Sequence, residues 1–88
     1  MKNNYIKVER FKDFLISGTV SGVVKVNDLV EVYDLLNNPL GIYSHIEAIS
    51  IMGIHYDYIE NGTSASFLIP EIYESLLDKG YKIVVISE

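Results

Sequence analysis

Short runs of alternating β-branched and aromatic residues recur along this chain, and turn-forming residues separate them roughly every 8–15 positions. Such runs favour strands, because branched and aromatic side chains pack well on a pleated surface. The first two runs occupy residues 5–11 and 14–20. In the second run Phe14, Ile16 and Val20 share one face at the strand period of two. Short strands at this spacing are typical of a small all-β sandwich or barrel.

The remaining strand-like runs alternate in the same way and lie at residues 29–34, 41–52, 63–69 and 82–87. The 41–52 run changes phase in its middle, because Ile46 and Ile49 would lie on opposite faces of a regular strand. A β-bulge near Glu47 and Ala48 would turn both isoleucines to the interior.

Two places depart from the plain strand pattern. Gly18 stands inside the second run without a side chain to pack, which predicts a sharp bend or the close approach of another strand. Residues 70–79 predict one short helix, because Pro70 suits the first helical position and Ile72 and Leu76 stack one turn apart.

These elements predict one domain over residues 1–88. We expect an all-β fold: a small β-barrel, closed or nearly closed, of six or seven mostly antiparallel strands, with one short helix near residues 70–79. The expected core is Ile16, Val20, Val30, Val32, Ile46, Ile49, Phe67 and Leu77.

Composition excludes several classes of protein. The chain has no cysteine, which rules out disulfide frameworks, thiolate zinc sites and thiol catalysis. Its longest apolar stretches, such as residues 83–86, are far short of the roughly 20 residues that span a bilayer. The N-terminal residues lack an apolar signal region. We therefore expect a soluble, cytoplasmic domain without membrane association.

The charge balance disfavours nucleic acid as a partner. Seven Lys and Arg residues stand against twelve Asp and Glu residues, a net charge of −5. Affinity for nucleic acid depends largely on cations that neutralise phosphates. The cations approach a cluster only between Lys2 and Lys12, where Glu9 and Asp13 lie among them. A solvated face of mixed charge explains that segment better than a phosphate-binding patch.

The run at residues 18–32 reads Gly-Thr-Val-Ser-Gly-Val-Val-Lys-Val-Asn-Asp-Leu-Val-Glu-Val. It resembles the β-barrel domain II of translational GTPases such as elongation factor Tu and initiation factor 2. That family shows Gly-x-Val, a further glycine, an aliphatic-Lys-x-Gly-Asp turn and an alternating aliphatic strand. Here Asn27 stands where the family has the turn glycine, a substitution that left-handed backbone tolerates.

The resemblance extends over residues 5–87, through segments at 44–49, 60–63 and 77–84. The usual Gly-Asp pairs are missing at Asn27, Thr63 and Tyr81. The chain also contains no Gly-x-x-x-x-Gly-Lys-Ser/Thr phosphate loop. The resemblance therefore implies a stand-alone copy of the barrel without the GTPase domain. The barrels that it resembles contact the aminoacyl end of tRNA and the ribosome.

No set of residues predicts catalysis or a cofactor. His45, Glu47 and His55 form the one plausible metal-binding combination, but no fourth ligand is evident and an outward polar face explains His45 and Glu47. The serines lack a Gly-x-Ser-x-Gly nucleophile motif. Asp57 and Glu60 lie in a turn context, where carboxylates bond local amides. We expect no catalytic residue, no metal and no cofactor, and so no enzyme.

Seven tyrosines are the most unusual feature of the composition. Tyr33 and Tyr43 border one predicted hairpin loop, and Tyr56 and Tyr58 flank a turn. Tyrosine is a good strand former at a half-buried rim, it is enriched at protein interfaces, and it stacks on single-stranded bases. The pattern leaves these three interpretations open.

Apolar residues also remain on the outer faces of the predicted strands. When Ile16 and Val20 point inward, Leu15 points outward, and a strand that is apolar on both faces needs a cover. We expect a symmetric homodimer to provide it. The candidate interaction residues are Leu15, Leu29, Tyr33, Tyr43, Tyr56, Tyr58, Val84 and Ile86.

The sequence thus favours a non-catalytic binding or interaction module on a translation-factor-like barrel, with a protein as its partner. The alternative is an accessory protein that associates with RNA, tRNA or the ribosome, as the resemblance implies. The net charge of −5 and the absence of a basic stripe count against that alternative.

Overall fold

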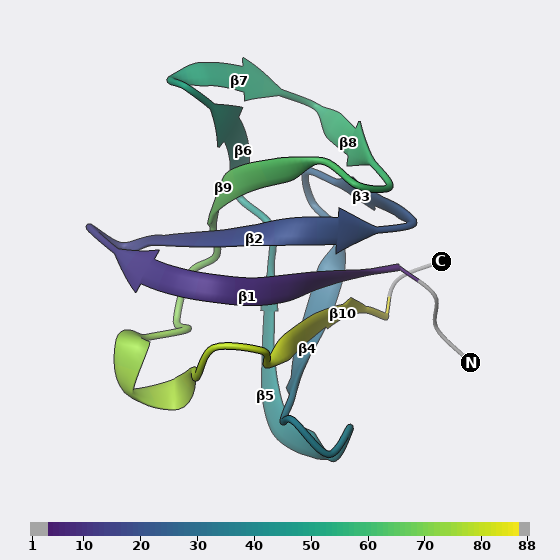
Figure 1. The fold of residues 1–88 in the computed structure, drawn as a ribbon, viewed down its shortest axis with the longest axis vertical. Helices are drawn as coiled ribbons and strands as arrows, with labels where there is room; N and C mark the ends of the chain where they lie inside the picture. The colour runs from purple at the N-terminus through teal and green to yellow at the C-terminus, as the bar shows by residue number, and fades with distance from the viewer. Residues whose placement is uncertain (1–3, 87–88) are drawn as a thin grey trace.

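The computed structural model describes residues 4–86, and this part of the chain folds into strands connected by tight turns (Figure 1). The strands are β1 (Tyr5–Lys12), β2 (Leu15–Ser21), β3 (Val23–Lys25), β4 (Leu29–Tyr33), β5 (Pro39–His45), β6 (Ala48–Ile51), β7 (Ile54–Tyr56), β8 (Tyr58–Glu60), β9 (Ser64–Leu68) and β10 (Lys82–Val85). One 3₁₀ turn, η1 (Glu74–Leu76), interrupts them.

Eight of these strands form one sheet in the order β5-β4-β10-β1-β2-β9-β6-β7, and β3 pairs with β8 in a separate ribbon. Every pairing among the described strands is antiparallel. The all-β, antiparallel class is therefore confirmed, with more strands than the six or seven expected. Among residues 4–86 no helix is long and apolar enough to cross a membrane.

The sheet does not close into a barrel, because the edge strands β5 and β7 do not pair with each other within residues 4–86. Instead the chain leaves its β4 partner at the end of β5 and joins β9 as β6. Main-chain bonds hold this junction: Asn27 N–H donates to the Ile46 carbonyl at 2.7 Å, and Glu47 N–H donates to the Leu68 carbonyl at 2.8 Å. A strand break replaces the predicted bulge, and both Ile46 and Ile49 are still buried.

The core lies on the inner face of the curled sheet. Every residue of the expected core is buried. Register explains how the core is continuous: Val32 pairs with Ile83, Ile83 with Ile6, and Ile6 with Val20, so one apolar row crosses four strands. Fully burying each such side chain contributes about 1.5–3 kcal/mol.

The helix expected at residues 70–79 is wrong, because only the η1 turn is helical in that segment. Glu71 has a φ of 67°, outside the helical region, and Leu77 is extended. Ile72 and Leu77 are both buried, so an irregular path delivers two core side chains there. A helix of about ten residues has too little intrinsic stability to compete with that burial.

The main chain of β1 passes close to Gly18 of β2. A Cβ on Gly18 would lie 2.5 Å from the Lys7 carbonyl oxygen and 2.6 Å from Ile6 Cγ2. The register of β1 shifts here, because Val8 pairs with Gly18 and Arg10 pairs with the preceding residue of β2. The predicted close approach of another strand is confirmed.

We predict that Gly18→Ala destabilises the fold by about 1–3 kcal/mol, since the new methyl group collides with main-chain atoms of β1. Urea unfolding followed by circular dichroism measures this loss as a lower midpoint. Ser66→Ala, on the neighbouring strand β9, is the control and should stay within about 0.5 kcal/mol of wild type. An unchanged midpoint for Gly18→Ala would show that the two strands separate at little cost.

Candidate interaction surfaces

The outer face of β4, β5 and β10 brings together much of the predicted interaction set. Glu31 pairs with Val84 on one side and with Tyr43 on the other, and residues directly opposite each other share a face of the sheet. The Ile86 N–H donates to the Leu29 carbonyl at 2.8 Å, which continues the β4–β10 pairing. We call this surface the tyrosine–leucine face; its residues are Leu29, Glu31, Tyr33, Tyr43, Val84 and Ile86.

Exposure differs across the tyrosine–leucine face. Leu29 is 52% exposed and Tyr43 is 59% exposed, whereas Tyr33 and Ile86 are half-buried. Val84 is buried although it points outward, because it lies between Tyr5 of β1 and Glu31 of β4. The accessible apolar surface is therefore supplied by Leu29 and Tyr43, with Ile86 beside them.

A carboxylate lies in the middle of this face. Glu31 is buried, and the Gly41 N–H donates to its Oε2 at 3.3 Å. Tyr43 pairs with Glu31 across the strands, so its phenol and this carboxylate share one face of the sheet. The negative charge of Glu31 is the main cause that raises the pKa of Tyr43 above its ordinary value of 10.0. The Tyr43 ring is largely exposed, so it stays accessible to a partner beside this carboxylate.

A cation borders the same face. Lys82 pairs with Tyr33, and its Nζ lies 5.2 Å from the centroid of the Tyr5 ring, within the range of a cation–π contact. The same Nζ donates to Asn37 Oδ1 at 2.7 Å. Opposite charges therefore occur together on this surface, which is otherwise apolar.

The structure separates Leu15 from the rest of the predicted set. Leu15 pairs with Lys12 at the closed end of the β1–β2 hairpin, whereas Val84 pairs with Tyr5 at the start of β1. Leu15 is half-buried there. Leu15 and the tyrosine–leucine face therefore lie at opposite ends of β1.

Tyr56 and Tyr58 lie at the other end of the sheet, where the chain forms an arch through β7 and β8 beside β9 (Figure 1). Both tyrosines are exposed and line an open groove of about 460 Å³. We call it the arch groove; its lining residues are Ile51, His55, Tyr56, Asp57, Tyr58, Ile59, Glu60 and Thr63. The sequence pattern missed β7 and β8 because each has only three residues, too few to show a clear alternation.

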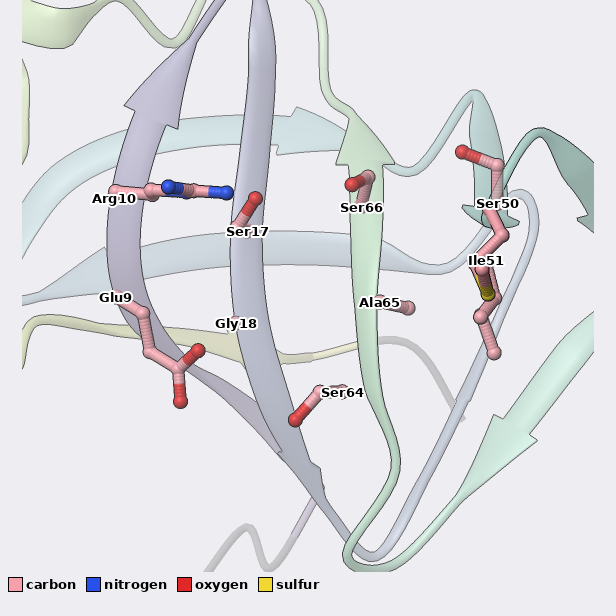
Figure 2. A pocket seen from close by; sticks show the side chains of 10 residues that line it. Glu9, Arg10, Ser17, Gly18, Ser50, Ile51, Ser64, Ala65 and Ser66 are labelled. Carbon is pink, nitrogen blue, oxygen red and sulfur yellow. The ribbon is translucent and has the colours of Figure 1, made fainter.

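A second depression, of about 440 Å³, lies over β1, β2, β9 and β6 and is floored by small side chains (Figure 2). Its serines form a cross-strand row, since Arg10 pairs with Ser17, Ser17 with Ser66, and Ser66 with Ser50. The bulge in β1 turns both Glu9 and Arg10 to this outer side (Figure 2).

Thr19 forms hydrogen bonds at the edge of this depression. Its hydroxyl donates to Glu9 Oε2 at 2.8 Å and lies 3.0 Å from the Ser64 hydroxyl. Activation of a serine as a nucleophile requires an adjacent base. The lining residues include no histidine, and the Glu9 carboxylate accepts from Thr19 rather than from a serine. The serine row therefore forms a polar surface without an adjacent base to activate a hydroxyl.

The histidines considered as metal ligands lie on opposite edge strands. His45 belongs to β5 and pairs with Leu29, whereas His55 belongs to β7 and pairs with Ser50. Among the residues that the structure describes, no three His, Asp or Glu side chains are grouped so that they could hold a metal ion.

A scan against known protein families and a search of curated proteins found no match to the chain. We therefore infer a function from the exposed side chains of the structure itself.

We predict that Glu31→Gln lowers the pKa of Tyr43 back toward 10.0, because it removes the negative charge that opposes ionisation of the phenol. The titration is followed by ¹³C NMR of the tyrosine Cζ, with Tyr43→Phe to assign the signal. By linkage, the fold keeps its full stability while Tyr43 is protonated and loses part of it as the pH rises through the raised pKa, because Glu31 repels the phenolate. Glu60→Gln, which removes a carboxylate from β8, is the control and leaves the Tyr43 titration in place. Equal Tyr43 pKa values in wild type and Glu31→Gln would contradict the contact.

Proposed function

We propose that the chain is a non-catalytic protein-interaction module that docks a second copy of itself on the tyrosine–leucine face. The observation that carries this proposal is the exposure of Leu29 and Tyr43 on strands whose inner faces already belong to the core. A sheet that is apolar on both faces gains from a cover on each side. Contiguous exposed apolar residues framed by polar ones are a common mark of a protein interface.

Tyr43 makes this face suited to binding, because its ring is exposed and lies on the same face as Leu29. Tyrosine supplies a large, rigid, amphipathic contact area at a low cost in conformational entropy. Tyrosine is also enriched at the buried centres of interfaces.

Charge favours a second copy over nucleic acid at this face. The chain carries a net charge of −5, so two copies repel in general. The tyrosine–leucine face is less repulsive, since the carboxylate of Glu31 is buried within it and Lys82 borders it. A two-fold axis presents each patch to its twin, so the exposed apolar residues of the two copies can meet.

The resemblance to a translation-factor domain II supports the idea of a module rather than an enzyme. The local geometry agrees with the proposed correspondence at Asn27, whose φ of 78° is the left-handed conformation that the family's turn glycine would adopt. An RNA- or ribosome-associated role stays the alternative within this proposal. Retention on heparin with a salt-dependent shift of an RNA probe would favour that alternative over a protein partner.

We predict that wild-type protein sediments as a dimer and that Leu29→Glu weakens dimerisation at least about tenfold, which corresponds to roughly 1.4 kcal/mol. The charge would have to be desolvated in the interface. Sedimentation velocity over a range of concentrations measures the change. Leu36→Glu is the matched control, because Leu36 is 80% exposed in the β4–β5 turn and lies outside the tyrosine–leucine face.

Circular dichroism establishes that both variants keep the wild-type fold. A wild-type protein that stays monomeric at high concentration would overturn the second copy as the partner. Equal weakening by Leu29→Glu and Leu36→Glu would show that association depends on charge alone and not on this face.

A further inference from the structure

The arch groove combines aromatic rings and carboxylates at a place remote from the tyrosine–leucine face. Tyr56 and Tyr58 flank Asp57, and Glu60 follows on the same strand as Tyr58. The groove is lined by both tyrosines and both carboxylates, and no Lys or Arg is among its described lining residues. With His55 neutral, the two carboxylates give the groove a negative charge beside two electron-rich phenol rings.

The main chain of the groove is held in place. The Val26 N–H donates to the Asp57 carbonyl at 2.9 Å, which fixes the bend between β7 and β8. Ile59 is buried and pairs with the buried Val24 of β3. The tyrosines and carboxylates thus project from a backbone that is anchored on both sides of the bend.

The carboxylates of the groove are not used by the fold. Within residues 4–86, no hydrogen bond or ion pair joins the side chain of Asp57 or Glu60 to another residue. The nearest cation in the register, Lys25, pairs with Tyr58 across the β3–β8 ribbon but does not line the groove. Two carboxylates on adjacent short segments repel each other, and a cation bound between them would relieve that repulsion.

Besides the carboxylates, the tyrosine rings of the groove can attract a cation. The face of a tyrosine ring attracts an ammonium or guanidinium group that lies within about 6 Å of its centre. Tyr56 is 42% exposed and Tyr58 is 55% exposed, so each ring can meet a ligand. A long aliphatic stem that ends in a cation matches a groove whose remaining lining includes Ile51 and Ile59.

We propose that the arch groove binds a Lys or Arg side chain from an extended, basic segment of a partner protein. Charge complementarity selects this occupant, since the chain has a net charge of −5 and two of its carboxylates line the groove. The adjacent strand β7 is an edge strand whose residues are all exposed, so an extended backbone can lie beside it. This site goes beyond the proposed dimer and shares no residue with the tyrosine–leucine face.

The test uses fluorescence anisotropy with a fluorescein-labelled peptide of about eight residues in which lysine and valine alternate, a pattern suited to an extended backbone. A matched peptide has glutamine in place of each lysine. We expect the lysine peptide to bind and the glutamine peptide to bind markedly more weakly. Equal binding of the two peptides would overturn the recognition of a cation.

Variants in the groove, each with a matched control outside it, test whether the peptide binds there. Tyr58→Leu keeps an apolar side chain but removes the ring, and we expect the affinity for the lysine peptide to fall about 2- to 5-fold. Glu60→Gln should weaken it by a similar factor. The controls are Tyr73→Leu and Glu74→Gln, which make the same changes at exposed positions outside the groove and should bind like wild type.

Equal losses in each variant and its control would overturn the proposal, because general charge attraction would then explain the binding. Amide shifts in ¹⁵N NMR spectra should be confined to β7, β8 and their flanking residues when the lysine peptide is added. Tight binding of a single-stranded RNA probe that Tyr58→Leu abolishes would also overturn it, and would identify the tyrosines as a base-stacking platform. The effect of Leu29→Glu on dimerisation is independent of all these peptide-binding results.

Discussion

The rest of this structure depends on the apolar row that crosses β4, β10, β1 and β2 on the inner face of the sheet. Val32, Ile83, Ile6 and Val20 pair in register, and each is nearly or fully buried. A chain of this length buries only about 60–65% of its unfolded surface, so it has few apolar side chains to spare for a second core. This chain places its buried side chains on the inner face of one curled sheet. The strands in this row therefore set which side chains point outward, and the outer residues define what the protein can bind.

The inward and outward residues of a strand could be predicted from the sequence where apolar and polar residues alternate regularly. Val30 and Val32 alternate with Glu31 and Tyr33, so the predicted core and the predicted outer face of β4 both follow from the period of two. Gly18 also predicted a structural feature correctly, because a glycine inside a strand often marks a bend or the close approach of another backbone.

The remaining features were decided by contacts distant in sequence. Pro70, Ile72 and Leu76 satisfy the local rules for a helix, yet burial of Ile72 together with Leu77 holds that segment in an irregular path. The break after His45 reflects a change of partner from β4 to β9, which no local pattern encodes. Leu15 was grouped with Val84 by its outward phase alone, although pairing places them at opposite ends of β1.

The two candidate surfaces differ in chemistry, and this difference suggests separate roles. The tyrosine–leucine face surrounds a buried carboxylate with apolar side chains, which suits a large, dry contact with a second copy. The arch groove is open and lined by two carboxylates and two tyrosines, which suits one projecting cation. Because the first lies on β4, β5 and β10 and the second on β7 and β8, one module could hold two partners at once.

The central claim is that Leu29 and Ile86 meet a second copy of the chain. An isotope-filtered NOE experiment on an equal mixture of ¹³C-labelled and unlabelled protein tests it most directly. We predict intermolecular NOEs from the Leu29 and Ile86 methyl groups to tyrosine ring protons of the unlabelled copy, and none from the Leu36 methyl groups. Absence of intermolecular NOEs at Leu29 and Ile86 in a sample that sediments as a dimer would contradict it.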